Sequence, residues 1–119
     1  MKYMEKTIEE LHELLKNKEV TSASLIKESL EKTHEIQEKY NAFVTILDEA
    51  KEKVVTDNLL SGIPSGIKDN YSTKGILSTG SSNTLRDYIP FFTATAIENL
   101  EKSGAVAVNK TVLDEFGMG

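Results

Sequence analysis

The stretch at residues 93–108, TATAIENLEKSGAVAV, most restricts the folds that this chain can adopt. Thr95 and Glu98 form a capping-box pattern, which indicates a helix N-terminus, and Gly104 suits the C-terminal cap of that helix. The apolar residues 105–108 that follow predict a small buried strand. A helix that runs through glycine into an apolar strand is the ending of a β-α-β unit, so we predict a partly parallel sheet.

Residues 1–40 carry the pattern of two amphipathic helices. Thr7 and Glu10 form another capping-box pattern, and apolar residues at helical spacing predict a helix over about residues 8–17. Thr21 can cap a longer helix that extends to about residue 39. The glutamates and lysines of both helices fall away from the apolar stripes.

Residues 41–83 alternate between extended and irregular patterns. The β-branched and aromatic NAFVTIL at 41–47 predicts a short strand or an extended segment, and DEAKEKVV at 48–55 has the composition of a helix. A turn signal, DNLLSG, leads into IPSGIKDN, which predicts a short strand. Residues 72–83 are rich in glycine, serine and threonine and predict a loop.

This order of elements predicts an α/β fold, in which N-terminal helices precede the first strands and helices of a mixed, mostly parallel sheet. We expect one domain, with a helical part at residues 1–40 and an α/β part at residues 41–119. Hydrophobic residues make up 39% of the chain and charged residues 28%, a balance that is typical of folded proteins.

Net charge and cysteine content exclude several functions. The formal net charge is −5, so the chain is a poor candidate for gripping phosphate backbones on its own. With no cysteine it has no disulfide, thiolate metal site or cysteine nucleophile, which fits a cytoplasmic protein. The opening residues lack the apolar core of a signal peptide, and no apolar run reaches the length of a bilayer span.

Histidine and serine patterns predict no site of their own. His12 and His34 lie in predicted helices without the spacing of metal ligands, so we interpret them as surface residues. The STGSSN segment lacks the glycine patterns of phosphate-binding loops. Ser81 and Ser82 have no G-x-S-x-G context and are expected to be turn residues that bind backbone amides.

Lys68 is the candidate for chemistry because it directly follows an apolar, strand-like run. Such a lysine is either a solvated residue at the mouth of a strand or a base inside a pocket, and the residues alone leave both open. A lysine amine is a base only when neutral, and burial must lower a reference pKa of about 10.4 by several units for this. The approach from Ile63 and Ile67, with Gly66 allowing close contact, is compatible with a pocket.

Two motifs make the chain resemble the amidase signature family. SGIPSGIKDNYSTKGILSTGSS is similar to the family's G-I-P, I-K-D-N and T-x-x-S pattern, and ATAIENLEKSGAVAVNKTVLDEFGMG is similar to its A-T to M-G segment. The opening helices and YNAFVTI match as well, so the resemblance covers essentially the whole chain. It implies the family's fold and its amide chemistry.

The resemblance places Lys68 at the family's catalytic lysine. The family uses a serine nucleophile, a second serine whose preceding peptide bond is cis, and that lysine as the base. Both serines of the family lie downstream of the position of Gly119, and Ser81 and Ser82 match neither. We therefore expect the sequence to be an N-terminal portion of such an enzyme that is inactive alone, either a fragment of a longer chain or a chain completed by a separate polypeptide.

The D-E-F-x-M-G ending is similar to that of one branch of the family, whose members work in amidotransferases acting on Glu-tRNA(Gln). This implies hydrolysis of glutamine, with the ammonia used to make Gln-tRNA(Gln). It also implies subunits B and C as partners in a heterotrimer, tRNA contacted mainly through a partner, and no membrane. No cofactor is expected in this chain, whereas ATP and Mg²⁺ are expected on a partner subunit.

Several residues depart from the family's pattern. Asn109 stands where glycine is usual, Val112 replaces an asparagine, and Gly117 replaces an alanine. Ser65 and Gly66 stand where bulkier apolar residues are common, and the segment before Gly62 is short.

Two alternative functions stay open from the sequence. The chain can be part of an amidase for another small amide, or a non-catalytic interaction module that docks through the helices at residues 8–39. A truncated α/β sheet is also expected to leave apolar surface uncovered.

Overall fold

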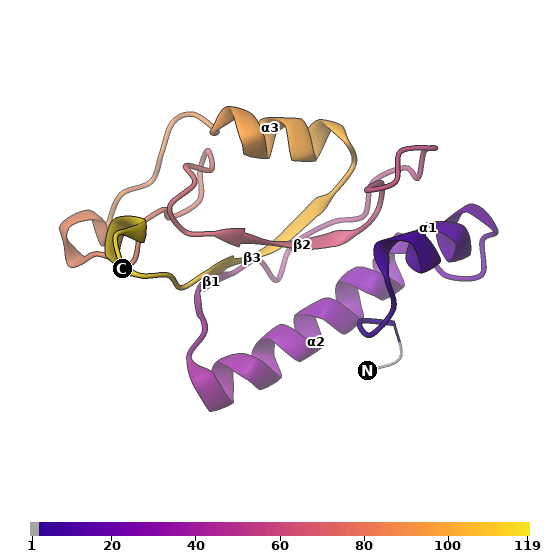
Figure 1. Ribbon diagram of the computed structural model, residues 1–119, viewed down its shortest axis with the longest axis horizontal. Coiled ribbons are helices and arrows are strands. Elements are labelled where there is room, and N and C mark those ends of the chain that lie inside the picture. The colour runs from indigo at the N-terminus through magenta and orange to yellow at the C-terminus, as the bar shows by residue number, and fades with distance from the viewer. Residues whose placement is uncertain (1–2) are drawn as a thin grey trace.

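The protein is an arrangement of helices on both sides of a small sheet, seen in a computed structural model that describes residues 3–119. In Figure 1, α2 runs below the strands, α1 lies to the right of them and α3 lies above them. Two short 3₁₀ helices, η1 and η2, are the remaining elements. The elements are α1 (Ile8–Lys16), α2 (Ser22–Tyr40), β1 (Phe43–Ile46), β2 (Pro64–Lys68), η1 (Asn83–Leu85), α3 (Thr95–Lys102), β3 (Val106–Thr111) and η2 (Glu115–Gly117).

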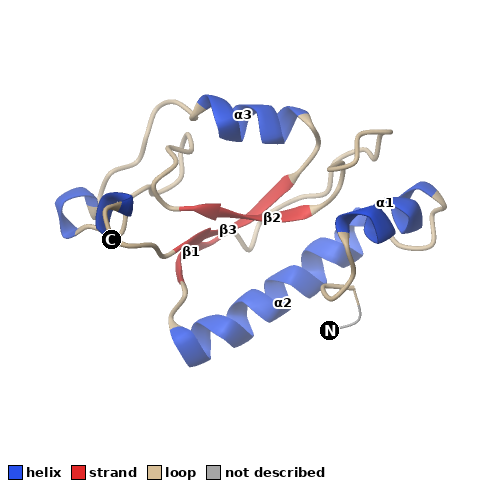
Figure 2. Ribbon diagram, in the orientation of Figure 1, coloured by secondary structure: helices blue, strands red, loops and turns tan. Residues whose placement is uncertain are grey.

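The sheet is mixed, as the sequence predicts, and β3 is its central strand. The strand order is β1-β3-β2, with β1 antiparallel to β3 and β2 parallel to it (Figure 2). Because α3 connects the parallel strands β2 and β3, the predicted β-α-β ending is confirmed. The β2–β3 register shifts between Ser65 and Gly66, and it then pairs Ile67 with Lys110 and Lys68 with Thr111.

The first two helices begin where their caps predict. The Thr7 side chain accepts a hydrogen bond from the backbone N of Glu10 at 3.1 Å, and the Thr21 side chain accepts one from Ser24 at 3.1 Å. Each bond satisfies an N–H group that has no partner inside its own helix. The C-cap of α2 is Asn41, whose φ of 50° is left-handed and turns the chain into β1.

Two apolar clusters form the core, and α2 contributes to both. The first joins α1 and α2 to the approach of β2, and the second seats Ile26 of α2 on Val106 and Val108 of β3. The apolar stripe of the opening helices therefore packs on this chain's own core. The first cluster consists of Leu11, Leu15, Val20, Leu25 and Ile63.

The helix predicted at residues 48–55 is wrong, because this segment is a turn followed by residues without regular secondary structure. The Lys53 amine donates to the carbonyls of Glu101 and Ala105, at 3.2 and 3.0 Å, and Ala50 and Val55 pack on the two core clusters. A helix of such a short segment has little stability of its own. Its contacts with the rest of the chain therefore decide its conformation.

Two boundaries in the last third also differ from prediction. The N-cap of α3 is Ala94 and makes no side-chain cap bond, so Thr95 lies inside the helix instead of capping it. The Ala94 backbone N donates to the carbonyl of Ser72 at 2.8 Å. This bond fixes Ala94, the residue before Thr95, at the start of the helix. The strand predicted at 105–108 extends through Asn109 and Lys110 to Thr111, because both polar side chains are buried with partners.

Candidate active site

Lys68 is the last residue of β2, at the edge where the carboxyl ends of the parallel strands β2 and β3 meet. In α/β sheets, ligands commonly bind outside this edge. The Lys68 residue is exposed. The ladder continues one residue further, because the backbone N of Asp69 donates to the carbonyl of Thr111 at 3.1 Å.

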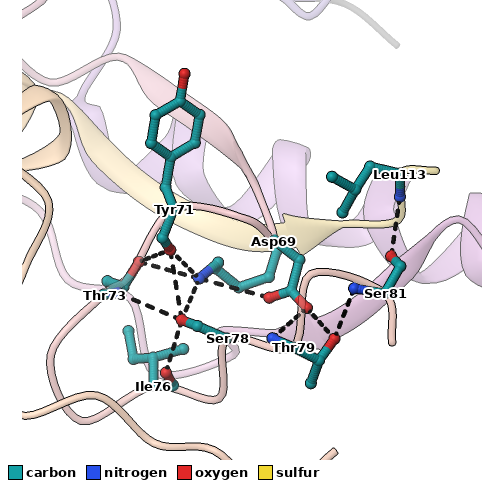
Figure 3. Close-up of polar contacts among 9 residues, drawn as sticks. Asp69, Tyr71, Thr73, Ile76, Ser78, Thr79, Ser81 and Leu113 are labelled. Carbon is teal, nitrogen blue, oxygen red and sulfur yellow. Dashed lines mark hydrogen bonds and ion pairs between the residues drawn. The ribbon is translucent and has the colours of Figure 1, made fainter. Parts of the chain in front are cut away.

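A second lysine, which the sequence motifs did not single out, lies beside Lys68 on the neighbouring strand. Lys110 is fully buried, and its amine donates to the carbonyl of Tyr71 at 2.9 Å, the hydroxyl of Thr73 at 3.0 Å and the hydroxyl of Ser78 at 2.8 Å. Figure 3 shows these acceptors converging on one point beside Asp69. Each of the three protons of the ammonium therefore has an acceptor.

The Asp69 carboxylate is the counter-charge, and it is fully buried as well. Its Oδ1 atom lies 3.5 Å from the Lys110 amine. Its Oδ2 atom accepts hydrogen bonds from both the backbone N, at 2.9 Å, and the hydroxyl of Thr79. The Asp69 carbonyl accepts from the backbone N of Gly80 at 3.0 Å, so the loop from 69 to 80 closes on itself.

Burial lowers the pKa of Lys110 from its ordinary value, and the charge of Asp69 opposes this shift. The amine is out of reach of solvent and all its protons are donated. Such a saturated group is suited to holding structure together. It is less suited to exchanging protons with a substrate.

The neighbouring serines act on the backbone, as the sequence predicts. The Ser81 hydroxyl accepts from the backbone N of Leu113 at 3.0 Å, as Figure 3 shows, and the Ser82 hydroxyl accepts from Thr84 at 3.2 Å. The backbone N of Phe116 donates to the carbonyl of Gly80 at 2.7 Å. The segment after β3 therefore packs on the loop that follows Lys68.

The two histidines do not meet at a site. His34 is exposed and pairs with Asp48, and His12 is half-buried on α1. Within residues 3–119, no group of three or more histidine, aspartate, glutamate or cysteine side chains could hold a metal ion.

The sequence contains a signal for Lys110 that resembles the one for Lys68. Lys110 comes one residue after the apolar run AVAV at 105–108, with Asn109 between them, much as Lys68 follows its own apolar run. The strand register then brings the two lysines to adjacent strands, through the pairs Ile67–Lys110 and Lys68–Thr111. Only the fold shows which of the two is buried.

Helices on both sides of a sheet, with polar groups gathered at the ends of its parallel strands, define an α/β protein with its candidate site in the usual place. The family model described as Amidase matches residues 24–119. The chain belongs to the amidase signature family.

Several known proteins are similar to this chain. The A subunit of glutamyl-tRNA(Gln) amidotransferase of Streptococcus pneumoniae (strain Hungary19A-6) is 44% identical over 128 aligned positions, which cover 100% of this chain. Its counterpart in Streptococcus thermophilus (strain CNRZ 1066) is 42% identical over the whole chain. This chain spans 26% of the length of each of these curated relatives.

Solved structures give the same fold. The crystal structure of the glutamyl-tRNA(Gln) amidotransferase A subunit from Thermotoga maritima superposes with a TM-score of 0.79 at 33% identity, covering 96% of this chain and 24% of that one. A structure described as an amidase superposes with a TM-score of 0.78 at 22% identity, which supports the fold alone. No helix within residues 3–119 is both long and apolar enough to cross a membrane.

Proposed function

We propose that the complete protein carrying this sequence hydrolyses glutamine and supplies the ammonia that converts Glu-tRNA(Gln) to Gln-tRNA(Gln). The observation that carries this proposal is the 44% identity, over the whole chain, to the A subunit of the amidotransferase. The position of Lys68 at the carboxyl end of a parallel strand supports it, since reactive groups gather at this edge of α/β sheets.

In the proposed mechanism, Lys68 is the base of a Ser-cisSer-Lys relay. The neutral amine accepts a proton from the bridging serine, which deprotonates the nucleophilic serine. That serine attacks the side-chain amide carbon of glutamine, backbone amides stabilise the oxyanion, and ammonia leaves. Water then releases glutamate from the acyl-enzyme. Both serines would come from sequence beyond residues 1–119, and that sequence would also cover Lys68, which is an exposed residue here.

The proposal includes partners. In an amidotransferase, subunits B and C would complete a heterotrimer, and a partner subunit would hold ATP, Mg²⁺ and most of the tRNA contacts. The net charge of −5 supports this division, because an acidic chain is poorly suited to bind the tRNA backbone itself. We propose a cytoplasmic location on the same grounds of function, supported by the absence of cysteine.

Replacement of Lys68 tests the proposed function. In the complete gene product assembled with subunits B and C, Lys68→Ala should lower kcat for glutamine hydrolysis by about 10²–10⁴-fold, because the relay loses its base. Lys74→Ala is the matched control, since Lys74 is an exposed lysine in the loop that follows. Glutaminase activity that survives Lys68→Ala would contradict the proposal. Hydrolysis of another small amide, without activity on glutamine, would favour a different amidase.

A further inference from the structure

The proposed relay leaves the buried pair of Asp69 and Lys110 without a role. Both side chains have no exposed surface, and their charged atoms lie 3.5 Å apart. Burying two charges is costly unless they are paired and fully hydrogen-bonded, and replacing such a pair by apolar residues is often neutral or stabilising. Stability alone is therefore a weak reason for this pair to be here.

We propose that Asp69 and Lys110 are positioning residues that fix the direction of the Lys68 side chain, an inference that rests on the proposed function. Successive side chains of a strand point to opposite faces of the sheet. The backbone N of Asp69 still bonds to Thr111, so Asp69 continues the geometry of β2 beyond its last residue. Holding the Asp69 carboxylate on one face therefore fixes the backbone so that the Lys68 side chain leaves β2 on the other face.

The Asp69 carboxylate is held from two directions. Thr79, in the loop that follows β2, donates both its backbone N–H and its hydroxyl to Oδ2. Lys110, on the central strand β3, faces Oδ1. The loop and the central strand thus fix the same side chain, and Figure 3 shows the Asp69 carboxylate between them.

The Lys110 amine extends this hold to the loop itself. Its bonds to the carbonyl of Tyr71 and the hydroxyls of Thr73 and Ser78 draw residues 71–78 toward β3. The chain on both sides of Lys68 is then fixed, since β2 precedes it in the sheet and the loop follows it. The buried pair therefore determines where the Lys68 side chain, the proposed relay base, is placed.

A positioning role has a distinct kinetic signature. A misplaced base slows proton transfer, whereas glutamine binding depends on other groups, so kcat should fall while KM stays constant. A misplacement of about 1 Å can cost on the order of 10²-fold in rate. A purely structural role would instead lower the amount of folded enzyme and leave the kcat of the folded fraction unchanged.

The closing experiment uses a matched pair at Thr79 in the complete gene product with subunits B and C. Thr79→Val removes the hydroxyl that donates a hydrogen bond to Asp69 but keeps the shape of the side chain, whereas Thr79→Ser keeps the hydroxyl. We expect Thr79→Val and Asp69→Asn to lower kcat by about 10- to 100-fold with KM for glutamine within about twofold. Thr79→Ser should stay within about threefold of the unchanged enzyme, because its hydroxyl restores the contact.

Val20→Ala controls for lost stability, because Val20 lies in the cluster of the opening helices. Active-site titration of every variant gives the concentration of folded enzyme, so that kcat is calculated per folded active site. If Thr79→Val behaves like Val20→Ala, with kcat unchanged, the positioning role is wrong and the proposed function stands. If Lys68→Ala retains full activity, the proposed function itself is wrong and takes this inference with it. Both proposals hold only if Lys68→Ala loses activity and Thr79→Val lowers kcat while Thr79→Ser does not.

Discussion

At the scale of single residues, close contacts decide which side chains this chain tolerates. Gly104 has a φ of 92°, and a Cβ atom placed there would lie 2.9 Å from the Cα of Ser61. Gly75 has a φ of 76°, but a Cβ atom placed there would meet nothing within 4 Å. The two glycines therefore separate the cost of a left-handed backbone from the cost of a steric clash.

Alanine substitutions at these glycines give different losses of stability. Gly75→Ala should lower the free energy of unfolding by about 1–2 kcal/mol, through backbone strain alone. Gly104→Ala should lower it by about 2–4 kcal/mol, because the backbone of Ser61 must also move. Urea unfolding of the purified variants measures both. Equal losses at the two positions would show that the clash is relieved at no cost.

At the scale of elements, β2 and β3 pair two positions at which the sequence resemblance implies departures from the family's pattern. The paired residues are Gly66 and Asn109, where the resemblance implies a bulkier residue and a glycine, respectively. A Cβ at Gly66 would lie 2.9 Å from Oδ1 of Asn109, while Nδ2 of Asn109 donates to the hydroxyl of Thr33 on α2 at 3.1 Å. The Asn109 side chain on β3 therefore occupies the space that a side chain at position 66 of β2 would need.

A double-mutant cycle tests this steric conflict. Gly66→Ala should cost about 1–3 kcal/mol in the unchanged protein, and clearly less when combined with Asn109→Gly, giving a coupling energy of about 1 kcal/mol. The control is Thr33→Val, which removes the partner of Asn109 but leaves the obstructing side chain in place. Gly66→Ala should remain costly in that background. Strict additivity with Asn109→Gly would rule out the steric conflict.

At the scale of the whole molecule, several large apolar side chains remain on the surface. Phe91 is 83% exposed and Met118 84% exposed, and Ile89 and Phe116 are exposed as well. Contiguous apolar surface is uncommon on monomeric proteins and favours association. Such uncovered surface is expected from the sequence, and these side chains agree with that expectation.

The 119-residue chain in isolation should therefore bind hydrophobic dyes and self-associate at micromolar concentration. Sedimentation over a range of concentrations and fluorescence of 8-anilinonaphthalene-1-sulfonate measure this behaviour. Replacing Phe91 with serine should reduce both signals, whereas Tyr40→Ser, at an exposed position at the end of α2, serves as the control. A monodisperse chain that binds no dye would contradict the prediction.

Local patterns in the sequence determined the elements whose stability is local. The Thr7 and Thr21 caps and apolar stripes of α1 and α2, and the passage through Gly104 into β3, depend on neighbouring residues, so they could be predicted. The position of Lys68 at a strand end could be predicted for the same reason. Its role as the relay base stays a prediction that comes from the family resemblance.

Only the tertiary structure decided the conformation of residues 48–55 and the environment of the two lysines. Residues 48–55 are held by contacts with α3 and both core clusters, and these contacts outweigh the helical composition of the segment. Lys68 and Lys110 both follow apolar runs, yet one is exposed and the other is enclosed by Asp69 and the loop after β2. The burial of each lysine depends on residues that are distant from it in the sequence, so no local sequence pattern predicts it.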